Sequence, residues 1–254
     1  MRIAVAVKRV PAPGARIVLT PDGRSIEAGH LSFTTSPHEE CAVEEAIRIK
    51  ESLGGTVTVL TLGPPEATEQ LRYAASVGAD EALLVPADGS DLDPRATARG
   101  LSDAIRWLEE EGGRFDLILF GNESADSGGF QVGIRVAHAL GRPVVSGIKG
   151  IDVSEGMVSA RREVDSGFEV YRVALPAVVA VKEGINLPRY PTLSGRLRSK
   201  KMEIHRHHAE LVPGGQRMVR LTSPPEQIVQ TEILGSGPDA AGEVVDVLER
   251  LGLL

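Results

Sequence analysis

Residues 121–131 read Gly-Asn-Glu-Ser-Ala-Asp-Ser-Gly-Gly-Phe-Gln and directly follow a short apolar run. Three glycines leading into a helical pattern are typical of a loop whose backbone N–H groups hold a phosphate at a helix N-terminus. Glu123 and Asp126 would then contact a ribose or a base edge. The competing interpretation is a plain solvated loop whose glycines serve only the turn.

A second segment suits docking rather than catalysis. The run Asn-Leu-Pro-Arg-Tyr-Pro-Thr-Leu at 186–193 is limited by prolines and ends at Leu193, and Arg196, Arg198, Lys200 and Lys201 follow it. An exposed apolar anchor ringed by charges is a common solution at protein–protein interfaces, because the anchor fills a pocket while the charges steer the approach. The competing interpretation is a basic solvated linker.

The usual catalytic signatures are absent from the sequence. There is no Gly-x-Gly-x-x-Gly after the first apolar run and no P-loop motif, which disfavours a standard dinucleotide enzyme or a P-loop ATPase. His205, His207 and His208 lie in a basic stretch and pair with no carboxylate at metal-ligand spacing. Ser124 and Ser146 lack a nucleophile-elbow sequence. We therefore predict no metal site and no catalytic triad.

Composition excludes further classes. The 254 residues carry a formal net charge of −7, which gives no general attraction to nucleic acid, and no apolar run is long enough to span a bilayer. The single cysteine, Cys41, excludes an internal disulfide and a cysteine-based cluster held by this chain alone. The first apolar run begins at Arg2 and leaves no room for a leader peptide, so we expect a cytoplasmic protein without membrane insertion.

The elements that must position these residues alternate along the chain. Short apolar runs predict strands at 3–7, 57–62, 82–85 and 117–120, and helical patterns follow at 37–53, 65–77, 93–111 and 129–140. Ser36 with Glu39 forms a capping box, and Pro37 suits the first helical position. The pattern predicts a three-layer, doubly wound α/β fold with a mostly parallel, Rossmann-like sheet.

From about residue 144 the pattern changes. Strands are predicted at 157–164, 169–175 and 177–181 as an antiparallel addition to the sheet, followed by an extended segment at 184–225 and a last helix at 239–251. Such a long aperiodic segment indicates a functional or partner-bound region. We divide the chain into a nucleotide-binding domain (1–183), a recognition loop with a basic segment (184–212), and a C-terminal arm and helix that wrap a partner (213–254).

In a doubly wound sheet, ligands bind beyond the carboxyl ends of the strands. This rule selects four loops: the segment after Val7, the Ser36 cap, the turn after Leu62, and residues 121–131. We expect them to meet at one edge of the sheet.

Several motifs of the sequence together resemble those of a known family. The matching motifs are Val-Ala-Val-Lys-Arg-Val at 5–10, Ser-Pro-x-x-Glu at 36–40, Ala-Val-Glu-Glu-Ala at 42–46, Gly-Pro at 63–64, Ala-Asp at 79–80, the loop at 121–131, Arg-Glu-Val-Asp-x-Gly at 162–167, Leu-Pro-Ala-Val-Val at 175–179 and Pro-Arg-Tyr-Pro-Thr-Leu at 188–193. Together, in this order and over residues 1 to about 205, they resemble the beta subunit of electron transfer flavoprotein.

The resemblance implies a heterodimer in which the alpha subunit holds most of the FAD site and the beta subunit buries a structural AMP. The AMP contacts would be Ala6, Ser36, Pro37, His38, Glu39, Leu62, Gly121, Asn122, Glu123, Ser124, Ala125, Asp126, Ser127, Gly128, Gly129, Phe130, Gln131 and Val132. These positions fall in the loops that the strand-end rule selects.

The resemblance also implies an electron carrier without bond-breaking catalysis of its own. It would accept electrons from flavin dehydrogenases of the acyl-CoA dehydrogenase type, as in fatty acid beta-oxidation, and pass them to a quinone oxidoreductase. Glu163 would face the alpha subunit near the flavin domain. Docking of the dehydrogenases would use Arg189, Tyr190, Leu193, Arg196, Lys200 and Lys201, with Leu193 as the anchor.

Two departures from the family pattern leave the ligand open. Many members have Asn where this chain has Ser36, and the loop at 121–131 keeps Asp126 and Gln131 but loses further carboxylates. Some relatives bind a second FAD at this position and bifurcate electrons, so AMP is favoured without excluding that type. A stand-alone adenine-nucleotide enzyme or sensor is the alternative from another class, but it needs a base near the glycine loop, and the loop itself has none.

Overall fold

The first strand, β1 (Arg2–Ala6), lies in the middle of a nine-stranded sheet. The computed structural model describes residues 1–87, 92–225 and 231–254. They divide into a large unit, Met1–Arg220, which contains this sheet, and a small unit, Leu221–Leu254. The strand order is β11-β5-β4-β1-β6-β10-β7-β8-β9, and every pairing from β11 to β7 is parallel. The predicted doubly wound, mostly parallel sheet is confirmed.

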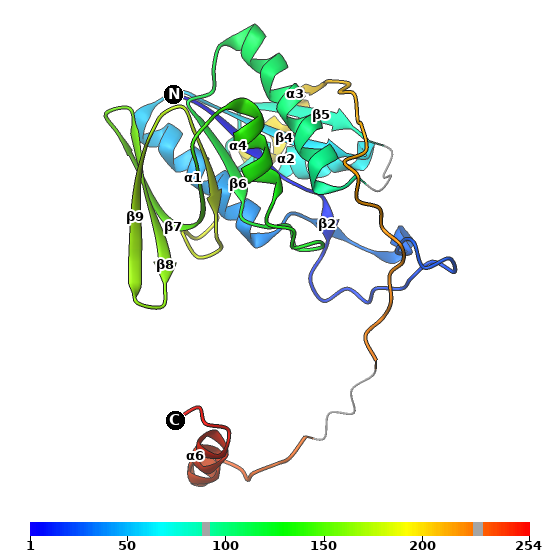
Figure 1. The fold of residues 1–254 in the computed structure, drawn as a ribbon, viewed down its shortest axis with the longest axis vertical. Helices are drawn as coiled ribbons and strands as arrows, with labels where there is room; N and C mark the ends of the chain where they lie inside the picture. Colours follow the sequence, from blue (N-terminus) through cyan, green and yellow to red (C-terminus); the bar gives the residue numbers. More distant parts are fainter. Residues whose placement is uncertain (88–91, 226–230) are drawn as a thin grey trace. The chain divides into compact units, whose positions relative to one another are not determined.

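The predicted strands and helices of the first half are present with small shifts at their ends (Figure 1). The strands are β4 (Thr56–Gly63), β5 (Glu81–Pro86) and β6 (Leu117–Gly121). The helices are α1 (Pro37–Leu53), α2 (Thr68–Val77) after the 3-10 turn η2 (Pro65–Ala67), α3 (Pro94–Gly112) and α4 (Val132–Leu140).

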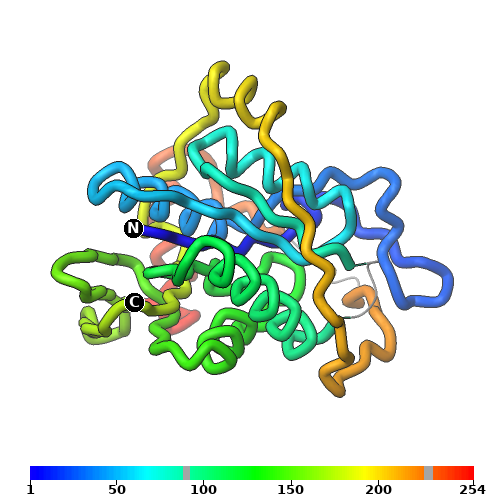
Figure 2. The backbone as a smooth tube through the Cα atoms, turned by 90° about the horizontal axis from the view of Figure 1, so that it is seen from above, coloured from blue at the N-terminus to red at the C-terminus, as the bar shows by residue number. Residues whose placement is uncertain are grey.

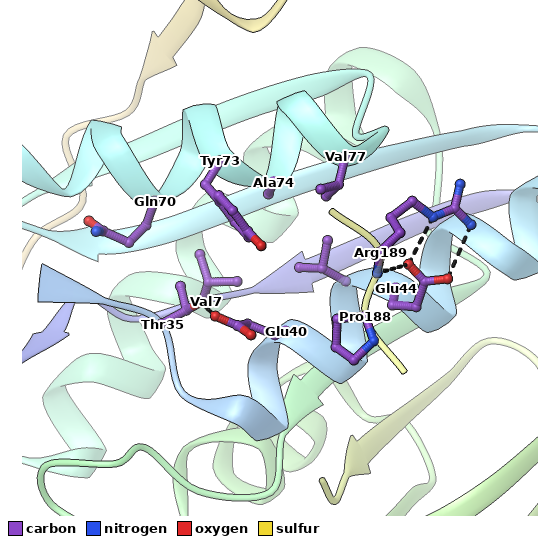
Figure 3. Close-up of a pocket in the computed structure, with 11 residues that line it drawn as sticks. Val7, Thr35, Glu40, Glu44, Gln70, Tyr73, Ala74, Val77, Pro188 and Arg189 are labelled. Atoms are coloured by element: carbon purple, nitrogen blue, oxygen red, sulfur yellow. Dashed lines mark hydrogen bonds and ion pairs between the residues drawn. The ribbon is translucent and has the colours of Figure 1, made fainter. Parts of the chain in front are cut away.

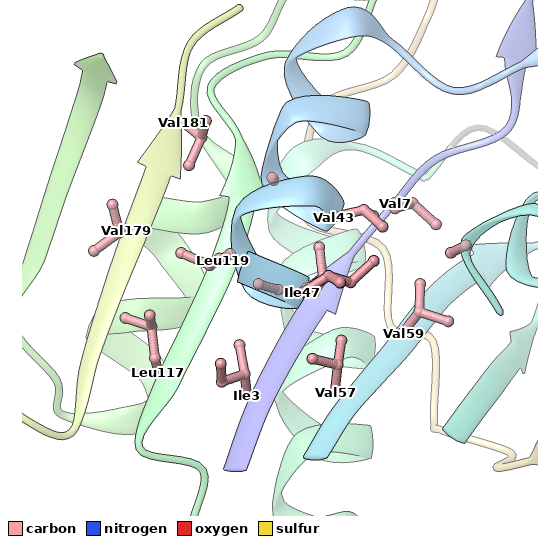
Figure 4. Close-up of a cluster of buried hydrophobic side chains, with 14 of the residues drawn as sticks. Ile3, Val7, Val43, Ile47, Val57, Val59, Leu117, Leu119, Val179 and Val181 are labelled. Atoms are coloured by element: carbon pink, nitrogen blue, oxygen red, sulfur yellow. The ribbon is translucent and has the colours of Figure 1, made fainter. Parts of the chain in front are cut away.

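Alternate residues of the central strands build a core on each face of the sheet. Ile3 and Val5 of β1 pack with the buried side chains of α1 and α2, whereas Ala4 and Ala6 pack with those of α3 and α4. Figure 4 shows the first face, where Val43 and Ile47 of α1 lie over β1 and its neighbours. A strand that is buried on both sides must be apolar throughout, which explains its continuous apolar run.

One prediction about the second half of the sheet is wrong. Strand β10 (Ala177–Val181) does not belong to an antiparallel addition, because it lies between β6 and β7 (Val144–Ser154) and is parallel to both. The antiparallel part is β7 with the hairpin of β8 (Met157–Val164) and β9 (Gly167–Ala174). All five residues of β10 are buried, as befits a central strand.

The segment 184–225 was predicted to be extended, and this is also wrong in part. It contains helix α5 (Leu193–Lys201) and strand β11 (Ile204–Arg206), which adds to the edge of the sheet beside β5. Figure 2 shows this segment, in yellow to orange, running on from α5 across the large unit. Helix α5 packs against α2, so most of the segment belongs to the folded body.

Short elements complete the two units. Strands β2 (Val10–Pro11) and β3 (Phe33–Thr34) form a small antiparallel sheet, with the 3-10 turn η1 (Ala28–His30) between them. The small unit contains the 3-10 turn η3 (Pro238–Ala240) and the predicted last helix, α6 (Ala241–Arg250). Among the residues described, no helix combines the length and the apolar character needed to cross a bilayer.

Candidate functional site

The order of the strands creates a switch point beside β1. From β1 the chain moves outward through β4 and β5 on one side, and it then returns to place β6 on the other side. The connections after β1 and β6 therefore diverge at the carboxyl ends of these two strands. In open α/β sheets, ligands bind in the crevice at such a divergence. We refer to this place, at the carboxyl ends of β1 and β6, as the predicted crevice.

Helix α1 begins at this crevice with a complete capping box. The Ser36 hydroxyl accepts the backbone N–H of Glu39 at 3.3 Å, and the Glu39 carboxylate accepts the backbone N–H of Ser36 at 3.0 Å. The Ser36 hydroxyl also donates to the carbonyl oxygen of Glu123 at 3.2 Å, which fastens the loop after β6 to the cap. The predicted cap is confirmed.

Glu39 is buried where the start of α1 meets the end of β6. Burial raises the pKa of its carboxyl group to about 7, although hydrogen bonds from the backbone N–H groups of Ser36 and Lys8 act in the opposite direction. Gly121, the last residue of β6, lies so close that a Cβ atom there would stand 2.6 Å from Cγ of Glu39. The close approach of β6 to α1 therefore requires glycine at this position.

An ion pair and a histidine contact hold the loop after β6 against its neighbours. Lys8, two residues beyond β1, places Nζ 2.6 Å from Oδ2 of Asp126. Nε2 of His38 lies 3.4 Å from Oε1 of Glu123, while Nδ1 of His38 accepts the backbone N–H of Glu183 at 3.0 Å. Partial burial opposes ionisation of Asp126, but the Lys8 ammonium holds the pKa of that carboxyl below its usual range.

Lys8 is the functional candidate that the sequence reasoning missed. The 121–131 loop contains no base, but the fold brings this lysine to Asp126 from 118 residues away. The sequence did contain a signal for it, because Lys8 closely follows the first strand, whose carboxyl end borders the crevice. A base therefore does lie beside the glycine loop in the folded protein, contrary to the prediction from the sequence.

The rest of the loop is compact and leads into α4. Ser124 and Ser127 share a hydrogen bond of 2.8 Å between their hydroxyl groups, and the carbonyl oxygen of Ser124 accepts the N–H of Gly128 at 3.0 Å. Phe130 has a φ of +54°, an uncommon value for a bulky residue, and its side chain is exposed. Gln131 gives α4 no side-chain cap, because its amide oxygen instead accepts bonds from Arg135.

The predicted AMP residues all fall at this one edge of the sheet. Ala6 ends β1, Leu62 is the penultimate residue of β4, and the remaining residues surround the start of α1 and the loop after β6. Their exposure differs: the Glu39 side chain is buried beneath the edge, and Leu62 packs against the core on the α3 side. Phe130 is half-exposed.

The predicted docking residues separate into two groups. Tyr190 and Leu193 are 90% and 76% exposed, and the three predicted basic docking residues of α5 are also exposed: Arg196, Lys200 and Lys201. Arg189, by contrast, turns inward to α1, where its guanidinium pairs with Glu44 and Glu51. A hollow of about 410 Å³ lies beside it, between the predicted docking segment (residues 186–201) and helices α1 and α2.

Glu163 lies apart from both groups. It is on β8, opposite Phe168 of β9, and pairs with Lys149 of β7 at 2.7 Å. That lysine lowers the pKa of the exposed Glu163 carboxyl. Glu163 therefore belongs to the antiparallel hairpin rather than to the crevice. Within the described parts of the chain, no group of three or more histidine, cysteine, aspartate or glutamate side chains could hold a metal ion.

Comparison with known proteins places this geometry in a family. The chain matches the model of the electron transfer flavoprotein domain over residues 27–212. It is 33% identical to the electron transfer flavoprotein subunit beta of Bacillus subtilis over 204 residues, which are 80% of this chain and 77% of the relative. The subunit beta of Mycobacterium leprae is 36% identical over 208 residues, with the same coverage. That of Syntrophomonas wolfei is 32% identical over 234 residues, or 92% of this chain and 90% of the relative. The chain therefore belongs to the electron transfer flavoprotein beta-subunit family.

Proposed function

We propose that this chain is the beta subunit of a heterodimeric electron transfer flavoprotein, which carries electrons from flavin dehydrogenases of the acyl-CoA dehydrogenase type to a quinone oxidoreductase. Family membership supports the electron-transfer role, and the name "subunit beta" of the relatives supports pairing with an alpha subunit. FAD, held mostly by that subunit, would supply the redox chemistry. Residues of this chain would shape the shared interface, with Glu163 facing the alpha subunit.

The second part of the proposal is a structural AMP at the crevice beside β1. The observation that carries it is the meeting of three separate segments, namely the Ser36 cap, the end of β1 and the loop after β6, through the contacts of Ser36 with Glu123 and of Lys8 with Asp126. A crevice at a switch point with glycine-rich walls is a common adenine-nucleotide site.

The groups at this crevice fit a nucleoside monophosphate. Helix α4 starts without a side-chain cap, so the N–H groups of its first turn are suited to an anion. Lys8 supplies a positive charge at the same edge, and Asp126 and Glu123 supply acceptors for ribose hydroxyl groups or for an adenine amino group. The side chain of Glu39, which is buried, would support the site from beneath.

The direct test is to identify the nucleotides that the heterodimer contains. The chain is expressed with its candidate alpha subunit, the purified complex is denatured, and the released nucleotides are quantified by chromatography and absorbance. One FAD and one AMP per heterodimer would support the proposal. Two FAD and no AMP would indicate the bifurcating type. A chain that purifies alone and releases ATP would instead indicate a stand-alone adenine-nucleotide protein.

Leu193→Ala is expected to raise the KM for the heterodimer, as electron acceptor of a flavin dehydrogenase, about tenfold or more. Leu193 is highly exposed at the start of α5, and a buried apolar anchor at an interface commonly contributes about 2 kcal/mol or more. The FAD content should not change. Dehydrogenase-coupled reduction of the heterodimer gives the KM, and the absorbance of the flavin gives the content.

Leu53→Ala is the matched control for this variant, because Leu53 is a 50% exposed leucine at the end of α1, outside the docking segment. Its KM should equal that of the unmodified heterodimer. An unchanged KM for Leu193→Ala would exclude Leu193 as the anchor.

A further inference from the structure

Arg189 is bound to the body of the protein by nearly all of its donor groups. Nε and Nη2 donate to the two carboxylate oxygens of Glu44 at 2.9 and 3.1 Å, and Nη1 and Nη2 donate to those of Glu51 at 2.6 and 2.9 Å. Its backbone N–H donates to Glu44 as well, at 3.2 Å. Two bidentate pairs on one guanidinium fix both its position and its plane.

Glu44, the carboxylate that binds Arg189 from α1, is buried and paired with arginines. Its side chain is only 4% exposed in the middle of α1, and Arg189 and Arg48 are its charged partners. Burial opposes its ionisation, but the hydrogen bonds from Arg189 and Arg48 hold the pKa of its carboxyl group below the usual range. Figure 3 shows Arg189 reaching Glu44, and Pro188 is among the residues that line a small pocket, as are Val7 and Tyr73.

Leu187 and Tyr190, two of the residues near Arg189, are highly exposed. Leu187 is 84% exposed and Tyr190 is 90% exposed, so neither side chain holds the segment in place. The nearest other attachments are Asn186, whose amide donates to the carbonyl oxygen of Cys41 at 2.9 Å and to Glu45 at 2.8 Å, and helix α5. Arg189 is the charged attachment between these two.

Helix α5 is fixed separately at its far end. Arg72 of α2 donates to the carbonyl oxygens of Ser199, Lys200 and Met202, which are the last acceptors of α5 and the residue after it. Without Arg189, the stretch between Asn186 and α5 would therefore keep its tethers at both ends and the packing of Pro188, but it would lose its charged attachment. Leu187 and Tyr190 lie in that stretch, and Leu193, the first residue of α5, follows it directly.

We infer that Arg189 is a positioning residue, which fixes the apolar side chains of the docking segment in their binding arrangement before a partner arrives and does not itself contact the partner. The inference rests on the docking role proposed for this segment. Fixing a segment in advance reduces the conformational entropy that is lost on binding, so it should strengthen the association without changing the redox step.

The test compares Arg189→Ala and Arg189→Lys in the heterodimer with its alpha subunit. Hydrogen–deuterium exchange reports the order of residues 186–192, and dehydrogenase-coupled reduction reports KM and kcat. For Arg189→Ala we expect faster exchange in this stretch, a KM raised about tenfold, and an unchanged kcat. Lysine keeps the charge but loses the bidentate geometry, so it should restore the unmodified behaviour only in part.

Two further variants keep the test decisive. Arg189→Met combined with Glu44→Gln avoids leaving a buried carboxylate without its arginine. If the effects of Arg189→Ala come from the loss of the arginine–carboxylate pairs, the double variant should show the same hydrogen–deuterium exchange and the same KM. Arg196→Ala removes an exposed arginine of the same segment. It should alter the salt dependence of KM while leaving the exchange at 186–192 unchanged.

Specific outcomes would overturn the inference. Unchanged exchange for Arg189→Ala, together with a raised KM that depends less on salt, would make Arg189 a direct docking contact. Faster exchange with an unchanged KM would show that the prior order of the segment does not matter for docking. If the unmodified heterodimer accepts no electrons from any dehydrogenase, the proposed function fails instead, while the exchange data still decide whether Arg189 orders the segment.

Discussion

Gly195→Ala is expected to destabilise the protein by about 3 kcal/mol, because α5 would no longer fit against α2. A Cβ atom on Gly195 would overlap the carbonyl oxygen of Ser76, a backbone atom that cannot rotate away. Gly195 is buried in the first turn of α5, where its N–H donates to the Thr192 hydroxyl at 3.0 Å. Relief would require α5 to move outward and to release its bonds with Arg72.

Urea denaturation of the purified protein, followed by far-UV circular dichroism, measures this loss. Gly242→Ala is the matched control, because Gly242 lies in α6 with no atom within 4 Å of a Cβ built there. Alanine is a better helix former, so this control should be neutral or more stable by up to about 1 kcal/mol. A Gly195→Ala protein within about 0.5 kcal/mol of the unmodified one would mean that the two helices can separate at little cost.

At pH 8, Glu39→Gln is expected to make the protein more stable than the unmodified one. The difference in unfolding free energy between the two proteins should shift in favour of the variant by about 3 kcal/mol between pH 4 and pH 8. Burial raises the pKa of this carboxyl group from its ordinary 4.5 to about 7 in the folded protein. Glutamine has nearly the same shape, and its amide oxygen can still accept the N–H of Ser36, so the capping box survives.

The sign follows from where the proton is bound. A carboxyl group whose pKa is raised by folding retains its proton more strongly in the folded state than in the unfolded state. Its contribution to stability is therefore complete below pH 4.5 and is lost as the pH rises towards 7. The glutamine variant has no such loss, so its advantage should develop between pH 4.5 and 7 and stay constant above that range.

The measurement is the difference in unfolding free energy between the two proteins, from urea titrations at intervals between pH 4 and pH 8. Glu110→Gln, on the exposed surface of α3, controls for the removal of one glutamate charge as such. A difference between the Glu39→Gln and unmodified proteins that does not vary with pH would contradict the raised pKa.

The features that could be predicted from the sequence are those whose causes are local. The start of α1 is one example, because Ser36, Pro37 and Glu39 are all within one turn and together determine the cap. The meeting of the selected loops at one edge of the sheet is another, since it follows from the order of strands and helices. Leu193 is also exposed, as its proline-limited surroundings indicated.

Helix α5 could not be predicted from the sequence, because its buried face carries no large apolar residues. The residues that α5 buries are Gly195 and Ser199, four positions apart, and its two leucines, Leu193 and Leu197, are exposed. A search for apolar residues at helical spacing finds nothing to bury in such a helix. The small residues instead allow close contact with α2, and that contact depends on a partner far away in the sequence.

The place of β10 and the role of Lys8 could not be predicted for a related reason. A short run of Ala and Val is compatible with either strand direction, and only the pairing with β6 and β7 decides it. The contact between Lys8 and Asp126 likewise depends on two strand ends becoming neighbours. Arg189 was predicted to meet a partner, whereas its observed contacts are with acidic residues of α1.

The position of β10 has a consequence for the order in which a growing chain can fold during synthesis. Strand β7 leaves the ribosome before β10, yet in the finished sheet β10 lies between β6 and β7. A nascent chain that ends before residue 177 therefore has no native strand to join β6 to β7, and its β6 has a free edge. Such an edge can pair wrongly with other chains, so this protein should depend on chaperones most strongly while β8 and β9 are being translated.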